Sequence, residues 1–298
     1  MSVRFDQIDL SRLPPPDVIE PLDYEVLLAE MVAQVTAADP SLAPVLALES
    51  EPAVKVLQAV AYVRLLDRAR VNDAARAVML AQATGADLDN LAALFGVARA
   101  VIAPADDSAL PPVAAVLESD TRLRARAQLS LQAFSCGGPA GAYAFWAMTA
   151  TPAVLDAMVD SPAPGDVRVV VLRDPASSLT EDEMITAVRD MVTRDDIRVL
   201  CDNVYVQPAS PVPFTVVAAL ELLDGPDAGA VLDTARAAVA AFVAARFRIG
   251  ASVTRAGLIA ALYSAGVRDV VLTQPVENVE AAAHQVPVCT AITVAEAA

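Results

Sequence analysis

Residues 50–96, SEPAVKVLQAVAYVRLLDRARVNDAARAVMLAQATGADLDNLAALFG, contain the pattern that decides the fold. They predict one long helix that begins at a cap on Ser50 and stops at Gly85, followed by a short helix that ends at Gly96. A helix of about 34 residues would be ~50 Å long at a rise of 1.5 Å per residue. This is longer than a compact domain of this size needs, so we expect a helical stalk.

The predicted long helix is apolar on two opposed sides. With a helical rotation of about 100° per residue, one apolar side consists of Val54, Ala61, Leu65 and Met79. The opposite side consists of Val56, Val60, Val63 and Ala74. A helix of this kind has to be covered on both sides, which favours a bundle of several chains, although a central helix buried in its own domain is the alternative. The candidate bundle residues are Val54, Leu57, Ala61, Leu65 and Leu66.

Composition limits the class of protein. The chain has 298 residues, of which 56% are hydrophobic, so it can bury a sizeable core. A net charge of −16 and a single lysine argue against a nucleic-acid partner, because phosphate binding needs clusters of basic residues. Charged residues such as Arg64 and Arg246 interrupt the apolar runs, and residues 1–24 lack the apolar core of a signal peptide. We therefore expect no membrane partner and synthesis in the cytoplasm.

Periodicity and turn signals divide the chain into five parts and predict the α+β class, with a helical stalk followed by two small α+β lobes. The expected parts are an extended arm (1–22), the helical stalk (23–98), a Pro-rich connection with little regular structure (99–119), a first lobe (120–208) and a C-terminal lobe (209–298). In the first lobe, Thr180 and Glu183 predict a capping box at the start of a helix.

Signals for catalysis are few. The only histidine, His284, lies in an acidic loop, and Cys136, Cys201 and Cys289 show no CxxC spacing. The acidic runs 181–183 and 195–196 are better explained as charges at helix ends than as a metal site or an acid/base pair. We predict no catalytic, cofactor-binding or metal-binding residue and no enzymatic activity. Tyr143, Phe145 and Trp146 lie on one short predicted helix and are either core residues or interface anchors.

Seven segments, in order along the chain, resemble one family. They are Glu51-Pro52 with its helix, 72–97 (NDAARAVMLAQATGADLDNLAALFGV), 118–143 (ESDTRLRARAQLSLQAFSCGGPAGAY), 161–172 (SPAPGDVRVVVL), 195–207 (DDIRVLCDNVYVQ), 223–227 (LDGPD) and 286–294 (VPVCTAITV). The series resembles the baseplate J-like proteins of contractile-tailed bacteriophages and related phage-tail bacteriocins. Trp146 departs from the pattern, since a more polar residue such as His is expected there.

The resemblance implies a structural protein of the virion tail baseplate, assembled in the host cytoplasm and needing no cofactor. It implies that two copies join one copy of a second wedge protein through a shared bundle of N-terminal helices. Six wedges would then close into an inner ring that couples host contact to sheath contraction, with other baseplate and sheath-initiating proteins as further partners. The alternatives are a helical adaptor outside a virion and, less favoured, an enzyme without a recognisable motif.

A closed ring needs a second, repeated contact between copies. An exposed strand edge offers unpaired backbone groups for such a contact, and the C-terminal lobe contains the predicted strands 267–272 and 289–294. The candidate ring-interface positions are 268, 270, 272 and 294, which are Arg268, Val270, Leu272 and Val294.

Overall fold

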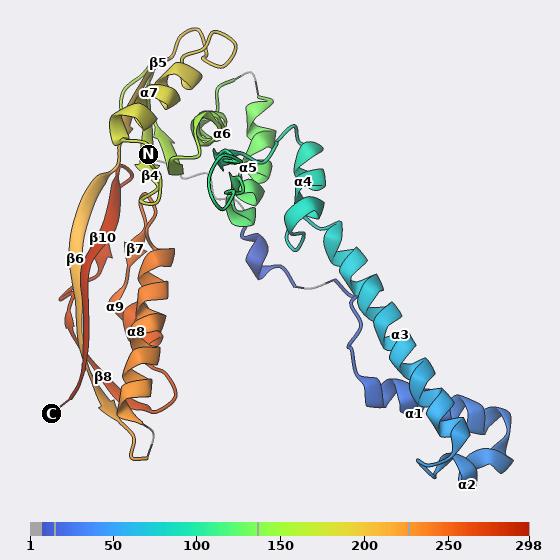
Figure 1. Cartoon of the computed structure of the whole chain (residues 1–298). Helices are drawn as coiled ribbons and strands as arrows, with labels where there is room; N and C mark the ends of the chain where they lie inside the picture. The colour runs from blue at the N-terminus through green and yellow to red at the C-terminus, as the bar shows by residue number, and fades with distance from the viewer. Residues whose placement is uncertain (1–7, 15, 136, 226, 298) are drawn as a thin grey trace. The chain divides into compact units, whose positions relative to one another are not determined.

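A computed structural model describes residues 8–14, 16–135, 137–225 and 227–297 of the chain (Figure 1). The described residues form a mixed α+β protein with several small sheets, which confirms the predicted class. The chain separates into two compact units, one of residues 8–98 and one that includes everything from Arg99 onward.

The unit of residues 8–98 contains helices and, among its described residues, no strand. Its elements are η1 (Leu10–Arg12), α1 (Tyr24–Ala38), η2 (Pro40–Leu42), α2 (Ala43–Leu46), α3 (Pro52–Ala77) and α4 (Gly85–Ala93). The carboxylate of Asp23 caps α1 by accepting hydrogen bonds from the backbone N–H groups of Glu25 and Val26, at 3.0 and 3.1 Å.

Helix α3 has 26 residues, so the prediction of one continuous helix to residue 84 was wrong. Its N-cap is Glu51 rather than Ser50, and its last helical residue is Ala77. The chain then turns, with the Ala83 N–H donating to the Met79 carbonyl at 2.8 Å. Ala83 and Leu88, on the two sides of Gly85, are both buried. Burial of these side chains overrides the high helix propensity of residues 78–83.

Residues 99–119 contain a β-hairpin, so the prediction of a connection with little regular structure was wrong. β1 (Val101–Ala103) pairs antiparallel with β2 (Val116–Leu117), and a further bridge joins Asp106 to Val113, so the segment is a β-hairpin. The three prolines, at positions 104, 111 and 112, lie between the paired residues and remove no hydrogen bond from the ladder. Their presence therefore did not preclude a hairpin.

The first α+β lobe has two helices before a three-stranded sheet. Its elements are α5 (Asp120–Ala133), α6 (Ala140–Ala150), β3 (Val154–Asp160), β4 (Asp166–Arg173), α7 (Glu181–Val192) and β5 (Asn203–Pro208). The sheet order is β3-β4-β5, with β4 antiparallel to β3 and parallel to β5. The Thr180–Glu183 capping box at the start of α7 is confirmed. Val169, Val170 and Val171 are consecutive and all buried, so both faces of β4 are covered.

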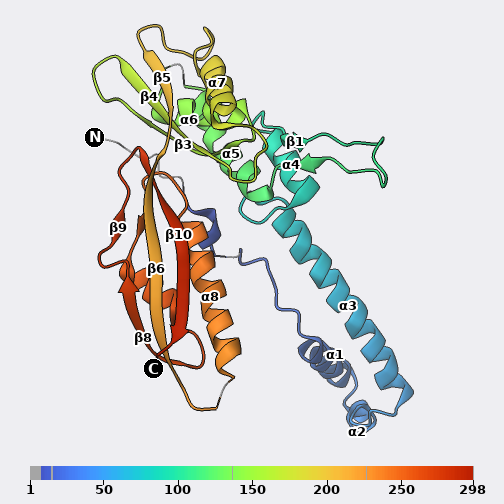
Figure 2. The same cartoon turned by 60° about the vertical axis from the view of Figure 1, so that its left-hand side comes forward.

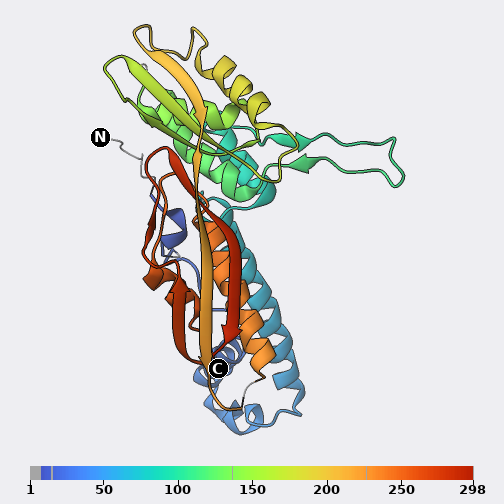
Figure 3. The same ribbon diagram turned by 90° about the vertical axis from the view of Figure 1, so that its left-hand side faces the viewer.

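The C-terminal lobe is a second three-stranded sheet covered by two helices. Its elements are β6 (Ser210–Leu222), α8 (Ala228–Ala245), β7 (Ser252–Val253), α9 (Arg255–Leu262), β8 (Val267–Gln274), β9 (Val279–Glu280) and β10 (Gln285–Glu296). β6 is central, with β10 parallel on one side and β8 antiparallel on the other. Figures 1 and 3 show α8 running along this sheet. The core between them includes Val216, Leu220, Val239 and Leu258.

Helix α8 is the one described helix that is long and apolar enough, by length and composition alone, to cross a membrane. The apolar runs of the sequence predicted no such helix. Val231, Ala235 and Val239 of α8 are buried in the core of the C-terminal lobe, so its apolar side already covers the sheet.

Candidate assembly surfaces

One side of α3 is covered within the chain. Helix α1 packs along α3 (Figure 1), with Leu27 and Met31 of α1 and Val54 and Ala61 of α3 all buried. Two of the five candidate bundle residues, Val54 and Ala61, are therefore used inside the chain. The structure leaves the other three partly accessible, with Leu57 and Leu65 half-buried and Leu66 half-exposed.

The opposite side of α3 is apolar and is not covered by the described residues of its own unit, 8–98. Val56, Val60 and Val63 are 62%, 49% and 55% exposed, and we call these three residues the outer face of α3. Their spacing of four and then three residues places them on one line along the helix, as in the contact line of a coiled coil. Large apolar side chains gathered in this way are typical of a surface that another chain covers.

The N-terminal arm is tied to the covered side of α3. The buried Asn72 side chain accepts a hydrogen bond from the Glu20 N–H at 3.1 Å and donates to the Glu20 carbonyl at 2.8 Å. Arg68 forms an ion pair with the Glu20 carboxylate at 2.6 Å. These contacts hold the arm beside α3 and leave the outer face free.

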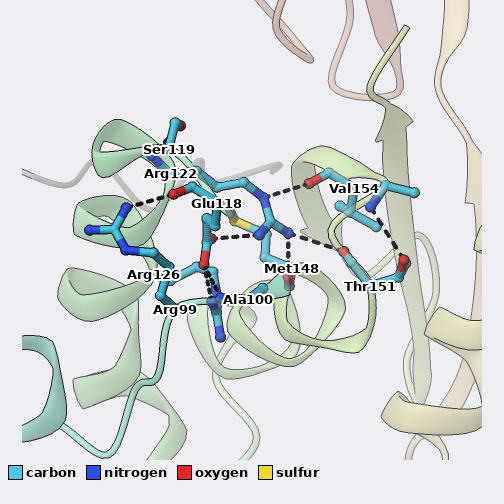
Figure 4. A network of polar contacts seen from close by, with 10 residues as sticks. Arg99, Ala100, Glu118, Ser119, Arg122, Arg126, Met148, Thr151 and Val154 are labelled. Carbon is cyan, nitrogen blue, oxygen red and sulfur yellow. Dashed lines mark hydrogen bonds and ion pairs between the residues drawn. The ribbon is translucent and has the colours of Figure 1, made fainter. Parts of the chain in front are cut away.

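A buried carboxylate holds the base of the β1–β2 hairpin (Figure 4). Glu118 is buried, and its two carboxylate oxygens contact Arg122 at 2.5 Å and Arg126 at 2.6 Å. The same carboxylate accepts a hydrogen bond from the Ala100 N–H at 3.0 Å, and the Glu118 carbonyl accepts one from Arg99 at 2.6 Å. Both ends of the hairpin are therefore fixed to the first turns of α5.

The Arg122 guanidinium extends this network to α6 and β3. It donates to the carbonyls of Met148, Thr151 and Val154 at 2.6, 3.0 and 3.2 Å. Burial lowers the pKa of Arg122 from its ordinary value, and the nearby Glu118 charge opposes that shift. An arginine with a buried carboxylate and three carbonyls around it has no free position for a substrate, so we interpret the network as structural.

The hairpin itself is exposed over its whole length. Leu110 at its tip is 96% exposed, and Ile102, Val113 and Leu117 are also exposed. Figures 2 and 3 show the hairpin extending away from α5 and the neighbouring sheet. A two-stranded hairpin without cover is marginally stable in water, which makes this hairpin a candidate contact element.

A shallow cavity of about 220 Å³ lies at the other end of α5. Its lining includes Phe134, Tyr143, Trp146 and Arg198, and we call it the aromatic pocket. The Tyr143 hydroxyl donates to Asp202 at 2.8 Å and accepts from the Val199 N–H at 3.2 Å, and burial raises the pKa of Tyr143. Tyr143 and Phe145 are core residues, whereas Trp146 is only partly buried. Tyr143 and Phe145 therefore have the predicted core role, and an interface role for Trp146 stays a prediction.

Gly138 closes one side of the aromatic pocket. It has φ +59°, and a Cβ at this position would collide with the Val199 side chain. Glycine adopts this positive φ without strain and has no Cβ to collide with Val199. Gly138 therefore allows a tight turn before α6.

The ring-interface candidates require a correction. Val270, Leu272 and Val294 are buried in the core of the C-terminal lobe, where they pack with α8 and α9. Their side chains cannot also contact a neighbouring copy, because alternate residues of a strand point to opposite faces. Arg268 is exposed. The side chains of Val270, Leu272 and Val294 are therefore unavailable to a neighbouring copy, and pairing through the backbone of the strand edges β8 and β10 stays a prediction.

Polar groups do not converge on a reaction centre in the part of the chain that the structure describes. No group of three or more His, Cys, Asp or Glu residues there could hold a metal ion. The His284 carbonyl accepts a hydrogen bond from the Ser210 N–H at 2.9 Å, and Asp196 pairs with Arg194 at 2.6 Å. The first contact belongs to a loop and the second to the end of a helix, and neither forms part of a reaction centre.

The two long features that define this molecule, a helix with an uncovered apolar face and an exposed hairpin, are those of an assembly component. Three family models match the chain: the Baseplate J-like N-terminal domain at residues 49–106, the Baseplate J-like central domain at 135–208 and the Baseplate J-like protein C-terminal domain at 214–295. Baseplate protein J of Escherichia phage P2 is 39% identical over 288 residues, which cover 95% of each chain. The chain therefore belongs to the baseplate J-like family.

Among solved structures, a chain of the anti-feeding prophage baseplate is similar to this one. The cryo-EM structure of that baseplate was 6-fold symmetrised. The match has a TM-score of 0.39 and 15% sequence identity, and it covers 60% of this chain and 43% of the other.

Proposed function

We propose that this chain is a structural baseplate protein of a contractile phage tail or a related contractile injection particle. In this proposal two copies join a second wedge protein through their N-terminal helices. Six such wedges close into an inner ring that couples host contact to sheath contraction. The protein would reside in the tail baseplate of the virion and catalyse no reaction.

The observation that carries the proposal is the outer face of α3. One side of this helix is covered by α1, and Val56, Val60 and Val63 on the opposite side are left in water. Burying about half of three valines is worth roughly 2–3 kcal/mol before the costs of association. Similarity along 95% of the chain to a phage baseplate protein supports the same role.

Co-purification with the second wedge protein tests the proposal. We expect Val60→Asp to abolish the complex, because a carboxylate would be buried in the bundle without a counter-charge. Val60 is half-exposed in the isolated chain, so the variant should fold normally. Leu65, another candidate bundle residue, is less suitable for this test because it is half-buried within the chain.

Lys55→Asp is the matched control, since Lys55 is exposed on α3 but lies off the outer face. It places the same new side chain on the same helix and should leave the complex intact. A Val60→Asp complex as stable as the wild-type complex would contradict the proposal. A helical adaptor outside a virion would instead purify as a well-behaved monomer or dimer without the wedge partner.

A further inference from the structure

The sheet of the C-terminal lobe has two edge strands, β8 and β10, because β6 lies between them. The Ala297 N–H donates to the Leu220 carbonyl at 2.8 Å, so Leu220 of β6 directs its backbone groups toward β10. Consecutive residues of a strand direct these groups to opposite sides. Ala219 and Glu221, the neighbours of Leu220, therefore face β8.

The same alternation identifies the backbone groups on the free side of β8. The two residues of β6 that face this strand pair with Val271 and Asp269. Val270, which lies between these partners, and Leu272 therefore point their N–H and C=O groups away from the sheet. Groups of this kind are a template on which a strand of another chain can add.

Side chains of the same lobe already bond to these outward groups. Arg255, at the start of α9, donates to the Leu272 carbonyl at 3.0 Å. The Asp269 carboxylate accepts a hydrogen bond from the Val270 N–H at 2.8 Å. An incoming strand would have to displace both contacts before it could form its own hydrogen bonds there.

A third contact continues the series at Arg268. The hydroxyl of Tyr263, directly after α9, donates to the Arg268 carbonyl at 3.4 Å. Arg255, Tyr263 and Asp269 thus bond to the backbone of β8 at three places, and we call these three residues the β8 guard. Tyr263 and Asp269 are exposed, so burial in the core does not explain their positions.

The position of Asp269 is unfavourable for the sheet itself. Asp269 lies directly opposite Glu221 in the ladder between β6 and β8, and both side chains are exposed. Like charges that are directly opposite each other destabilise a sheet. A charge on an edge strand also opposes the approach of another strand, and this gives Asp269 a role that the stability of the lobe does not explain.

The other edge strand, β10, is less completely occupied. Because the Ala297 N–H faces β6, the alternate residues Ile292, Val294 and Glu296 point their backbone groups outward. Among the described side chains, Arg236 of α8 bonds to this stretch, by donating to the Val294 carbonyl at 2.8 Å. No described side chain bonds to the backbone of Ile292 or Glu296. The contacts along β8 are therefore the more complete of the two sets.

We propose that the β8 guard prevents a second copy of this chain from adding its own edge strand to β8. Free chains are thereby kept from joining edge to edge through this side of their C-terminal lobes. The inference stands independently of the proposed baseplate role. It removes β8 from the two edges predicted to join neighbouring copies and leaves β10.

The substitution Asp269→Val in the full-length protein tests the guard. It removes the contact to the Val270 N–H, the charge on the edge and the repulsion with Glu221. We expect self-association about tenfold tighter than that of wild type in analytical ultracentrifugation, with no fall in the midpoint of thermal denaturation. Association no tighter than wild type would overturn the proposal. A lower midpoint would also overturn it, because Asp269 would then mainly stabilise its own lobe.

Glu221→Val is the matched control. It relieves the same repulsion and places the same side chain on the same exposed face of the sheet. Glu221 lies on the central strand β6, so this substitution leaves the β8 guard intact. The control should self-associate as weakly as wild type. If it associated as tightly as Asp269→Val, the exposed face rather than the edge would be responsible, and the proposal would fail.

Amide hydrogen exchange locates the contact in the Asp269→Val variant. The outward N–H groups of Val270 and Leu272 should exchange at least about tenfold more slowly in the associated variant than in the same variant diluted to monomer. This protection is expected because the strand of the second copy would then bond to them. Protection that appeared on β10 or α3 and not at these two residues would overturn the proposal.

Discussion

Helices α3 and α8 are both long and apolar, and they differ in what covers them. α8 is apolar enough to resemble a membrane span, yet none of the large apolar side chains of its described residues is exposed, because Val231, Ala235 and Val239 pack against the lobe's own sheet. α3 is less apolar overall and still leaves the valines of its outer face in water. Apolar content alone therefore does not identify an interface.

The size of the outward-facing side chains distinguishes the two helices. On α8 the exposed positions carry small or charged residues, such as Arg236, Ala237 and Ala240. On α3 they include the β-branched residues Val56, Val60 and Val63. Alanine loses little when it stays in water, whereas an exposed valine gains from burial. In the proposed function, the outward valines of α3 form the surface that a second chain covers.

The largest effect should come from placing a charge on the covered side of α8. Val239 is fully buried, and Val239→Asp would bury an unpaired carboxylate. We expect the free energy of unfolding to fall by about 4–5 kcal/mol, enough to unfold the C-terminal lobe. Chemical denaturation monitored by circular dichroism measures this change.

The matched variant on α3 is Val60→Asp, measured in the same way on the isolated chain. Because Val60 is half-exposed, its free energy of unfolding should change by less than about 0.5 kcal/mol. Equal destabilisation by the two substitutions would mean that α3 is covered within the chain, and the comparison would fail.

Removing the buried charge of Glu118 should have the next largest effect. Glu118→Gln leaves Arg122 and Arg126 without their shared carboxylate, and we expect the free energy of unfolding to fall by about 3 kcal/mol. The control is Asp120→Asn, because Asp120 pairs with Arg99 and its side chain is more exposed than that of Glu118. The control substitution should lower the free energy of unfolding by less than about 1 kcal/mol. Similar losses in the two variants would show that burial of the Glu118 charge is not decisive.

Local patterns in the sequence predicted much of this fold. The strand at 267–272, the short helix that follows the stop at Gly85 and the Thr180–Glu183 capping box agree with the structure. Each depends on neighbouring residues, through alternation, helical spacing or a cap. The edge strand predicted at 289–294 also exists, although it begins at Gln285.

Other features depended on tertiary contacts and could not be predicted. The hairpin at 101–117 is held by the buried Glu118, whose arginine partners come from the following helix. The end of α3 at Ala77 follows from burial of Ala83 and Leu88. The predicted strand 267–272 exists, but periodicity cannot tell which face of a sheet is buried, so the burial of Val270 and Leu272 in the core could not be predicted.

Overpacking tests the covered side of α3 with a smaller perturbation. Ala61 is fully buried where α1 packs on α3, and Ala61→Leu adds atoms to a filled space. We expect Ala61→Leu to lower the free energy of unfolding by about 1–3 kcal/mol. Ala59→Leu adds the same side chain at an exposed position of α3 and should be nearly neutral in thermal denaturation. If the two variants melted alike, α1 would not be firmly packed on α3.

The smallest expected effect comes from removing an ion pair, and it compares a largely buried pair with an exposed one. Asp160 pairs with Arg168 across β3 and β4, where the side chains are 12% and 21% exposed. Asp196 pairs with Arg194 at a helix end, where they are 62% and 52% exposed. Hydrogen bonds from arginine lower the pKa of both carboxyl groups.

A carboxyl group with a lowered pKa in the folded state stabilises the protein above its unfolded pKa, near 4. That stability is lost as the pH falls through the folded-state value. Asp160→Asn should therefore lower the free energy of unfolding at pH 7 by less than about 1 kcal/mol, and should make the fall in stability between pH 5 and pH 2 shallower. Asp196→Asn should change the pH profile less than Asp160→Asn does, because solvent screens the exposed Asp196–Arg194 pair. Denaturation curves across this pH range measure both, and a profile that flattened equally in the two variants would show that burial does not separate them.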